Sequence, residues 1–241
     1  KEDEWFAEVQ NDPTFKKHLH FDIGKVPIVA PEIHQTGSPH SAYMILDPSL
    51  GKKKSDDQAV GIFRIYDEIP ILEEIHVFKQ DIKLLTKELI DLAVDKGIPV
   101  IFTEDYGMQS LVNTWFNHWI DSYQLEGLTV RGINRGKLSK TQAVLDYMRA
   151  LMAGSQLLAP AARSKVLDQA SNFDVTRTDN KDDILDVGYY GNLIVGNPEL
   201  KELTILPYYI SSTFGGFSVE SSNQSSAVGA SGSYLLSYST K

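Results

Sequence analysis

The stretch AYMILDPSLGKKKSDDQAVGIFRIY, residues 42–66, carries most of the information about the fold that this sequence predicts. An apolar strand over residues 42–46 leads to a carboxylate, Asp47, where the apolar run stops. Pro48 interrupts that strand, a loop with a run of lysines follows, and residues 58–66 predict a second strand rich in β-branched and aromatic side chains. An acid at the end of a buried strand suits catalysis, because rigid backbone holds its oxygens while the loop leaves room for substrate. The alternative is that Asp47 and Pro48 only begin a turn, which is a common use of this pair.

The composition indicates an ordinary globular protein of 241 residues, long enough for one large domain with appendages. The chain has no cysteine, which excludes disulfides and cysteine-based zinc sites and agrees with a reducing cytoplasm. We expect no membrane span, since no apolar run reaches about 18 residues, and no signal peptide, since the N-terminal segment is polar. The net charge of −9 argues against a protein that coats nucleic acid, but not against an enzyme that cuts it.

The order of the predicted elements defines the fold class. A third strand over residues 70–78 follows after a short connection, so the first three strands should form an antiparallel meander. Asp81 should cap a helix over residues 82–95, and residues 98–103 predict a continuously apolar strand of the kind found inside a sheet. The later predicted elements are helices over 109–122, 140–153, 160–170 and 182–195 and a strand over 128–131. This order predicts an α/β protein with a ribonuclease H-like mixed sheet, in which helices flank a three-strand antiparallel meander plus parallel strands.

The chain is expected to have three parts. Residues 1–40 should be an approach segment, with a short helix over residues 2–10 followed by a proline-containing linker. Residues 41–206 should form the α/β domain. Residues 207–241 are rich in serine and glycine and carry almost no charge, which is typical of a flexible tail. We expect the chain to be a fragment of a longer protein.

Acidic residues recur where predicted strands end and where the last long helix begins: Asp47, Glu104, Asp105, Asp182, Asp183 and Asp186. Asp186 lies three and four residues after the two acids that open the helix, so all three share a face, and like charges there destabilise an isolated helix. Interaction with the helix dipole accounts for Asp182 and Asp183, but not for Asp186, which lies one turn inside. A divalent metal accounts for all of them, because Mg²⁺ and Mn²⁺ prefer oxygen ligands and a pair of ions can promote phosphodiester hydrolysis.

Two basic segments are candidates for contact with DNA phosphates. One contains Arg131, Arg135, Lys137 and Lys140 in a glycine-containing stretch without acids, and the other, 52–54, includes Lys53 and Lys54 in the loop after Asp47. An ordinary solvated surface loop is the alternative for the first segment.

These motifs together resemble the nuclease domain of the large terminase subunit of tailed bacteriophages, a ribonuclease H-like fold related to RuvC-type resolvases. The matching motifs are LDPSLG at 46–51 with KSD at 54–56, FTEDYG at 102–107, the basic stretch 136–149 and KDDILD at 181–186. The stretch WFAEVQNDP at 5–13 resembles the segment that leaves the family's ATPase domain. Two positions depart from the family pattern: Lys181 stands where histidine is frequent, and Val187 where alanine is frequent.

The resemblance implies a metal-dependent DNA endonuclease that cleaves concatemeric viral DNA during genome packaging. It implies that Asp47, Glu104 and Asp183 hold two Mg²⁺ or Mn²⁺ ions, and that Asp186 or Asp182 completes the site. The implied partners are double-stranded DNA, a viral portal and a small terminase subunit, in the host cytoplasm and without a membrane. Two alternatives remain open: a RuvC-like junction resolvase or transposase, and a catalytically silent module that docks a motor to the portal.

Overall fold

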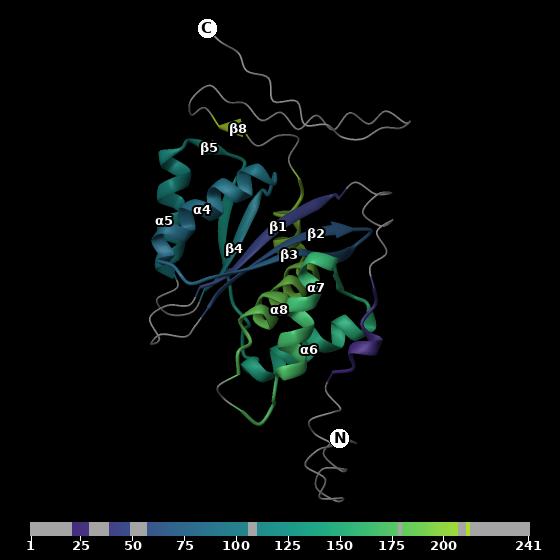
Figure 1. Ribbon diagram of the computed structural model, residues 1–241. Coiled ribbons are helices and arrows are strands. Elements are labelled where there is room, and N and C mark those ends of the chain that lie inside the picture. The colour runs from purple at the N-terminus through teal and green to yellow at the C-terminus, as the bar shows by residue number, and fades with distance from the viewer. Residues whose placement is uncertain are drawn as a thin grey trace, which may run out of the picture.

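The computed structural model describes residues 21–28, 39–48, 57–105, 110–177, 180–206 and 211–212. A central sheet has helices on both faces (Figure 1), so the predicted α/β architecture is confirmed. The helix predicted over residues 2–10, the lysine loop and nearly all of the predicted tail lie outside the described residues.

The predicted meander is present at the centre of the sheet. It consists of β1 (Ser41–Asp47), β2 (Gln58–Tyr66) and β3 (Ile69–Phe78), each antiparallel to the next. Every residue of β1 is buried, as expected for a continuously apolar strand covered on both faces.

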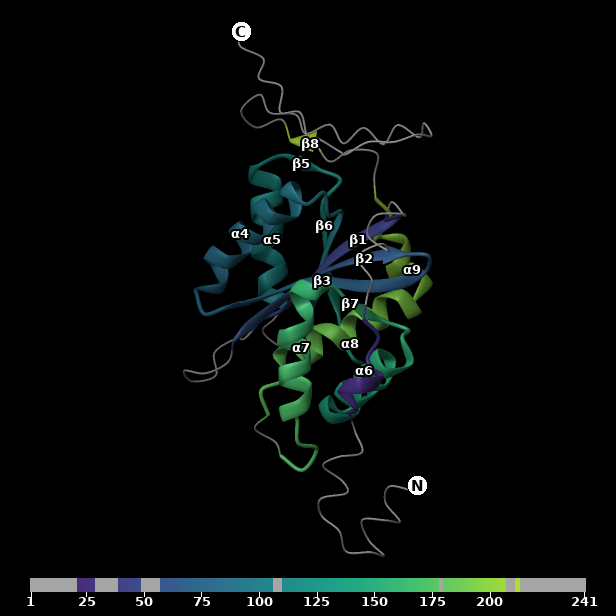
Figure 2. The same ribbon diagram turned by 45° about the vertical axis from the view of Figure 1, so that its right-hand side comes forward.

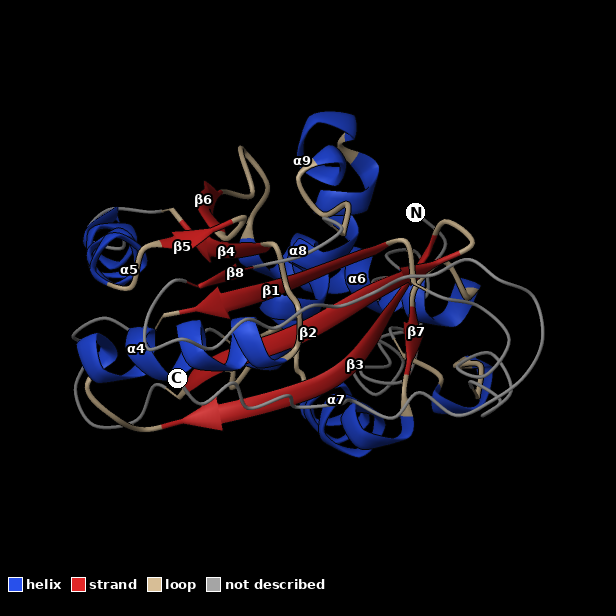
Figure 3. Ribbon diagram, turned by 90° about the horizontal axis from the view of Figure 1, so that it is seen from above, coloured by secondary structure: helices blue, strands red, loops and turns tan. Residues whose placement is uncertain are grey.

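Parallel strands extend the sheet on both sides of the meander. β4 (Val100–Glu104) runs parallel to β1, and β6 (Thr129–Ile133) runs parallel to β4. At the other edge β7 (Leu157–Leu158) runs parallel to β3. Among the described residues the order is therefore β6-β4-β1-β2-β3-β7 (Figure 3). Leu46 of β1 pairs with Thr103 of β4. The acids that follow them, Asp47 and Glu104, therefore lie side by side at the carboxyl ends of these two parallel strands.

Two helices, α4 (Ile82–Asp95) and α5 (Ser110–Ser122), cover one face of the sheet (Figure 2). The bounds of α4 are those predicted from sequence, and the Asp81 side chain caps it by accepting hydrogen bonds from the Lys83 and Leu84 backbone N–H groups. After α5 a separate two-stranded sheet pairs β5 (Leu125–Glu126) with β8 (Ser211–Ser212).

Three helices cover the opposite face: α6 (Lys140–Ala153), α7 (Pro160–Asn172) and α8 (Asp183–Gly196). The short helix η1 (Ile23–Lys25) contacts α6. The structure adds α9 (Pro198–Glu202) after the helix predicted over residues 182–195, because Asn197 ends α8 and its side chain caps the next helix.

Candidate active site

Strand alternation directs the two strand-end acids toward α8. In β1 the side chains of Tyr43 and Ile45 face the helical layer that contains α8, while Met44 and Leu46 face α4 and α5. Successive side chains of a strand point to opposite faces, so Asp47 continues the row of Tyr43 and Ile45. The same alternation applies in β4. Phe102 faces the α8 layer, and Glu104, two residues later, lies on the same side of the strand.

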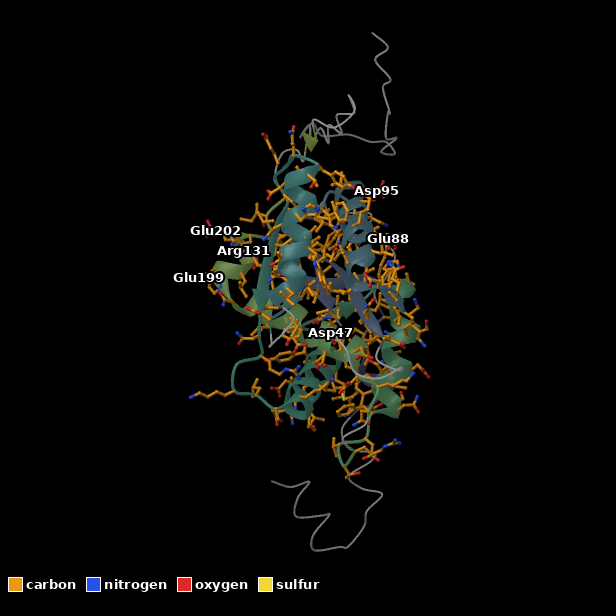
Figure 4. The ribbon with its side chains drawn as sticks, turned by 90° about the vertical axis from the view of Figure 1, so that its left-hand side faces the viewer. Asp47, Glu88, Asp95, Arg131, Glu199 and Glu202 are labelled. Atoms are coloured by element: carbon orange, nitrogen blue, oxygen red, sulfur yellow. The ribbon has the colours of Figure 1, made fainter. Side chains whose placement is uncertain are left out.

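Asp47 is buried among other acids. Asp47 is the last residue of β1 and is only 8% exposed, and Figure 4 labels it near the middle of the domain. Burial raises the pKa of Asp47 well above its usual value, and the negative charges of Asp186, Glu104 and Asp183 raise it further. The fold therefore gathers acids from β1, β4 and α8 within electrostatic reach of one another.

Glu104 is held in place by two donors. The Tyr190 hydroxyl of α8 donates a hydrogen bond to Glu104 Oε1 at 2.7 Å, and Arg135 Nη2 donates to the same oxygen at 2.5 Å. Arg135 follows β6, the strand next to β4, which brings its guanidinium to the same edge of the sheet. Burial and the Glu104 carboxylate both raise the pKa of Tyr190, so its hydroxyl keeps its proton and remains a donor.

The acids of α8 have cationic partners as well. Lys140 Nζ lies 2.7 Å from Asp182 Oδ1 and 3.0 Å from Asp186 Oδ2, and Arg135 Nη1 lies 3.7 Å from Asp186 Oδ1. Asp186 is only 1% exposed. Burial raises the pKa of Asp186 to about 7, even though Lys140 and Arg135 act to lower it.

The basic segment is divided between two environments. Arg135 and Lys140, which the sequence suggested as phosphate contacts, form ion pairs with the acids of the cluster. Arg131 and Lys137 are exposed, and Figure 4 shows Arg131 well away from Asp47. The fold thus brings Arg135 and Lys140 to the acid cluster, and their contact with DNA phosphates stays a prediction. Lys53 and Lys54 lie outside the described residues.

The cluster contains carboxylate oxygens, which are the ligands that a hard divalent cation prefers. Three of its acids, however, form ion pairs with Arg135 and Lys140. In the described part of the chain, no three His, Asp or Glu side chains are arranged to hold a metal ion. Arg135 and Lys140 instead supply positive charge to Glu104, Asp182 and Asp186. Buried carboxylates that raise one another's pKa are suitable ligands for Mg²⁺ or Mn²⁺, because a divalent cation removes the repulsion that opposes their ionisation.

Sequence reasoning missed Tyr190 and Gln169. Tyr190 lies one helical turn after Asp186, so helical periodicity was a signal that could have placed it beside the acids. Gln169 of α7 bonds the backbone N–H groups of Ile184 and Leu185, and no local pattern marks that contact.

No protein-family model and no curated protein matches this chain, but solved structures do. The human cytomegalovirus terminase nuclease domain superimposes with a TM-score of 0.58 at 12% identity, over 78% of this chain and 100% of that one. This chain has the terminase nuclease fold. The P22 large terminase nuclease domain gives a TM-score of 0.52 at 11% identity, over 78% of this chain and 94% of that one.

The large terminase from a thermophilic bacteriophage also matches, with a TM-score of 0.53 at 11% identity. The match covers 80% of this chain and 52% of that protein, so this chain spans about half its length. The predicted resemblance to terminase nuclease domains and the predicted fold are therefore confirmed. Among the described residues, every helix falls short of the length and apolar character needed to cross a membrane.

Proposed function

We propose that this chain is the nuclease domain of a terminase large subunit, a metal-dependent DNA endonuclease that cleaves concatemeric viral DNA during genome packaging. The observation that carries the proposal is the meeting of Asp47, Glu104 and the acids of α8 at one sheet edge of a terminase nuclease fold. One similar structure is a cytomegalovirus terminase nuclease domain, Mn soaked and inhibitor bound, with a TM-score of 0.56 at 10% identity. That structure supports Mn²⁺ or Mg²⁺ as the cofactor here.

In this proposal Asp47, Glu104 and Asp183 hold two divalent ions, and Asp182 and Asp186 complete the site. Bound divalent ions supply an activated water and stabilise the negative charge that develops on the phosphodiester. The protein contributes rigid positions for these oxygens, since Asp47 and Glu104 lie at strand ends and Asp183 lies in the first turn of α8.

Other side chains of the site orient the acids and balance their charge. Tyr190 and Arg135 fix the orientation of Glu104, and Lys140 lies between Asp182 and Asp186. The exposed Arg131 and Lys137 are the proposed contacts to the phosphates of double-stranded DNA, together with Lys53 and Lys54. The proposal also includes the division into residues 1–40, 41–206 and 207–241, and a portal and a small terminase subunit as partners.

Plasmid digestion tests the proposed activity. Supercoiled plasmid incubated with Mn²⁺ or Mg²⁺ should be nicked and linearised, and a chelator should stop the reaction. Asp47→Ala should abolish cleavage while the circular dichroism spectrum stays that of the wild type. Asp91→Ala, which removes an exposed acid on α4, is the matched control and should cut normally. Nicking by Asp47→Ala at the wild-type rate would contradict the assignment, and preferential cutting of a four-way junction would favour the resolvase.

A catalytically silent docking module is the second candidate. The ion pairs of Arg135 and Lys140 with Glu104, Asp182 and Asp186 favour it, because they already neutralise much of the acidic charge without metal. Titration calorimetry with Mn²⁺ separates the two candidates. The nuclease should bind Mn²⁺ and lose that binding in Asp47→Ala, whereas a silent module should bind none.

A further inference from the structure

We propose that Gln169 of α7 is a positioning residue for the acid cluster: it caps the N-terminus of α8 in place of Asp182 and so releases the Asp182 carboxylate to the site. The inference rests on the proposed function for its biological meaning. It rests on the hydrogen bonds at the start of α8 for its physical basis.

Asp182 occupies the N-cap position of α8 without acting as its cap. An aspartate at this position ordinarily accepts hydrogen bonds from the N–H groups two and three residues later. Within the described residues, the Asp182 side chain makes no such bond. Its Oδ1 lies instead 2.7 Å from Lys140 Nζ, and the residue is 6% exposed. The Asp182 carboxylate is thus turned toward Lys140 and Asp186.

Gln169 takes over both donors that Asp182 leaves. Its Oε1 accepts a hydrogen bond from the Ile184 N–H at 2.9 Å and from the Leu185 N–H at 3.1 Å. These are the N–H groups two and three residues after Asp182, the pair that an N-cap side chain uses. A single side chain from the neighbouring helix therefore satisfies the start of α8.

Helices α4 and α9 are capped in the ordinary way. Asp81 caps α4 through the N–H groups of Lys83 and Leu84, and Asn197 caps α9 through those of Glu199 and Leu200. An aspartate in this fold is thus able to cap its own helix. Asp182 differs from these two caps in its backbone, with φ −135° and ψ 7° where Asp81 and Asn197 are extended, and in its carboxylate, which pairs with Lys140.

The chemistry of Gln169 suits this role. Buried N–H groups at a helix start need an acceptor, and a helix start near solvent would often use a carboxylate. An amide oxygen supplies the acceptor without adding charge beside Asp182 and Asp183. If the amide is removed, the two N–H groups lose their partner, and Asp182 is the nearest residue in sequence that can replace it. Asp182 would then turn from the cluster to the helix.

The first measurement is Mn²⁺ affinity by titration calorimetry on the full chain. Gln169→Leu should weaken Mn²⁺ binding by about 10- to 100-fold, the range found when groups that orient metal ligands are removed. Gln169→Glu keeps an acceptor of the same length and should bind Mn²⁺ more tightly than Gln169→Leu does. Asn197→Ala is the matched control: it removes the cap of α9 and should lower the Tm while leaving Mn²⁺ affinity unchanged.

The second measurement is a double-mutant cycle on Tm, with chelator present. Asp182→Ala is made in the wild type, where Asp182 is not a cap, and in Gln169→Leu, where it should become one. The Tm loss caused by Asp182→Ala should be larger in the Gln169→Leu background. Additive Tm losses would overturn the proposal, because they mean that Asp182 does not move when Gln169 is lost.

The Mn²⁺ titration and the Tm cycle distinguish a failure of this inference from a failure of the proposed function. If the wild type binds no Mn²⁺ and cuts no plasmid, the proposed function fails, while the Tm cycle still decides the role of Gln169. If plasmid is cut but the Tm losses are additive, only the inference on Gln169 fails. Should Gln169→Leu not fold, Gln169→Asn takes its place in both measurements, since its shorter side chain keeps the amide but withdraws it from the helix start.

Discussion

Arg135 Nη2 lies 2.5 Å from Glu104 Oε1, so a residue whose sequence context suggested a DNA contact is the ion-pair partner of a proposed metal ligand. The Arg135 side chain is 19% exposed and that of Glu104 is 10% exposed. Both charges are therefore largely removed from water, and each depends on the other for compensation. Arg135 therefore balances the charge of Glu104 from within the protein, as Lys140 does for Asp182 and Asp186.

Arg135→Met should destabilise the metal-free protein by about 3 kcal/mol, because it removes a cation that pairs with the buried Glu104 carboxylate. Saturating Mn²⁺ should restore part of that loss, since a divalent ion can replace the missing charge. Urea unfolding with and without chelator measures both effects. Arg131→Met is the control, on strand β6, which leads to Arg135. Arg131 is exposed, so its loss should change stability by no more than about 0.5 kcal/mol. Equal losses in the two variants would contradict the importance of the Arg135–Glu104 pair.

The metal-free protein should lose stability as the pH rises from about 4 to about 7. Burial raises the pKa of Asp186 from 3.8 in the unfolded chain to about 7 in the folded protein, so the folded state holds this proton more tightly. A group of this kind stabilises the fold fully below its unfolded pKa, and that contribution disappears as the pH passes its folded pKa. The effect at Asp186 has an upper limit of about 4 kcal/mol.

Urea unfolding at several pH values, with chelator present, checks this dependence. Asp186→Asn removes the titrating group, so the difference between wild type and variant isolates its contribution from that of other carboxylates. That difference should change between pH 4 and pH 7 and level off above it. A wild-type curve parallel to that of Asp186→Asn would mean that Asp186 is ionised with an ordinary pKa.

DNA affinity should depend on salt through the exposed cations, not through Arg135. Neutralising Arg131 and Lys137 together should flatten the slope of log K against log salt by about 1.8, because each lost phosphate contact contributes about 0.9. The measurement uses a short duplex with Ca²⁺ in place of the catalytic ion. Lys87→Gln, on the outer side of α4, is the control and should leave the slope unchanged. An unchanged slope in the double variant would mean that Arg131 and Lys137 do not contact DNA phosphates, and Lys53 and Lys54 would be the next residues to test.

Local sequence patterns predicted the elements whose ends are set locally. The bounds of α4 and α6 agree with prediction. In each case a capping residue, Asp81 or Ser139, stands directly before residues with helical apolar spacing and marks the start of the helix. Gly154 ends α6 in the left-handed conformation that glycine favours. The strand-end position of Asp47 and Glu104 was predictable for the same reason, since each follows an apolar run.

Contacts between distant segments were not predictable in this way. Two examples are the ion pair between Arg135 and Glu104 and the cap that Gln169 gives to α8. Both depend on how the helices pack on the sheet, and the spacing of apolar residues along the sequence does not predict that packing. The two-residue strands β5, β7 and β8 are too short to have a period. α9 was missed because a proline after an asparagine indicates a stop as well as it indicates a new capped helix.

The close approach of α8 to the sheet leads to a further prediction. A Cβ atom on Gly191 would lie 2.6 Å from Cε1 of Phe63, a residue that is fully buried. Phe63 has little freedom to move, because its ring stacks on that of Tyr43 with centroids 5.0 Å apart. The Tyr43 hydroxyl in turn donates a hydrogen bond to the Gly191 carbonyl at 3.1 Å. Gly191 thus allows α8 to lie close to β1 and β2.

Gly191→Ala should therefore destabilise the protein by about 1–3 kcal/mol, the usual effect of overpacking a core. It should also weaken Mn²⁺ binding, because displacing α8 moves Asp186 away from Asp47.

Gly196→Ala is the control on the same helix: among the described residues no atom lies within 4 Å of its new Cβ. That variant should be neutral or more stable by up to about 1 kcal/mol, from helix propensity alone. Urea unfolding and Mn²⁺ calorimetry on both variants decide the matter. Equal stability and equal Mn²⁺ affinity of the two would mean that the spacing of α8 from the sheet does not set the geometry of the acids.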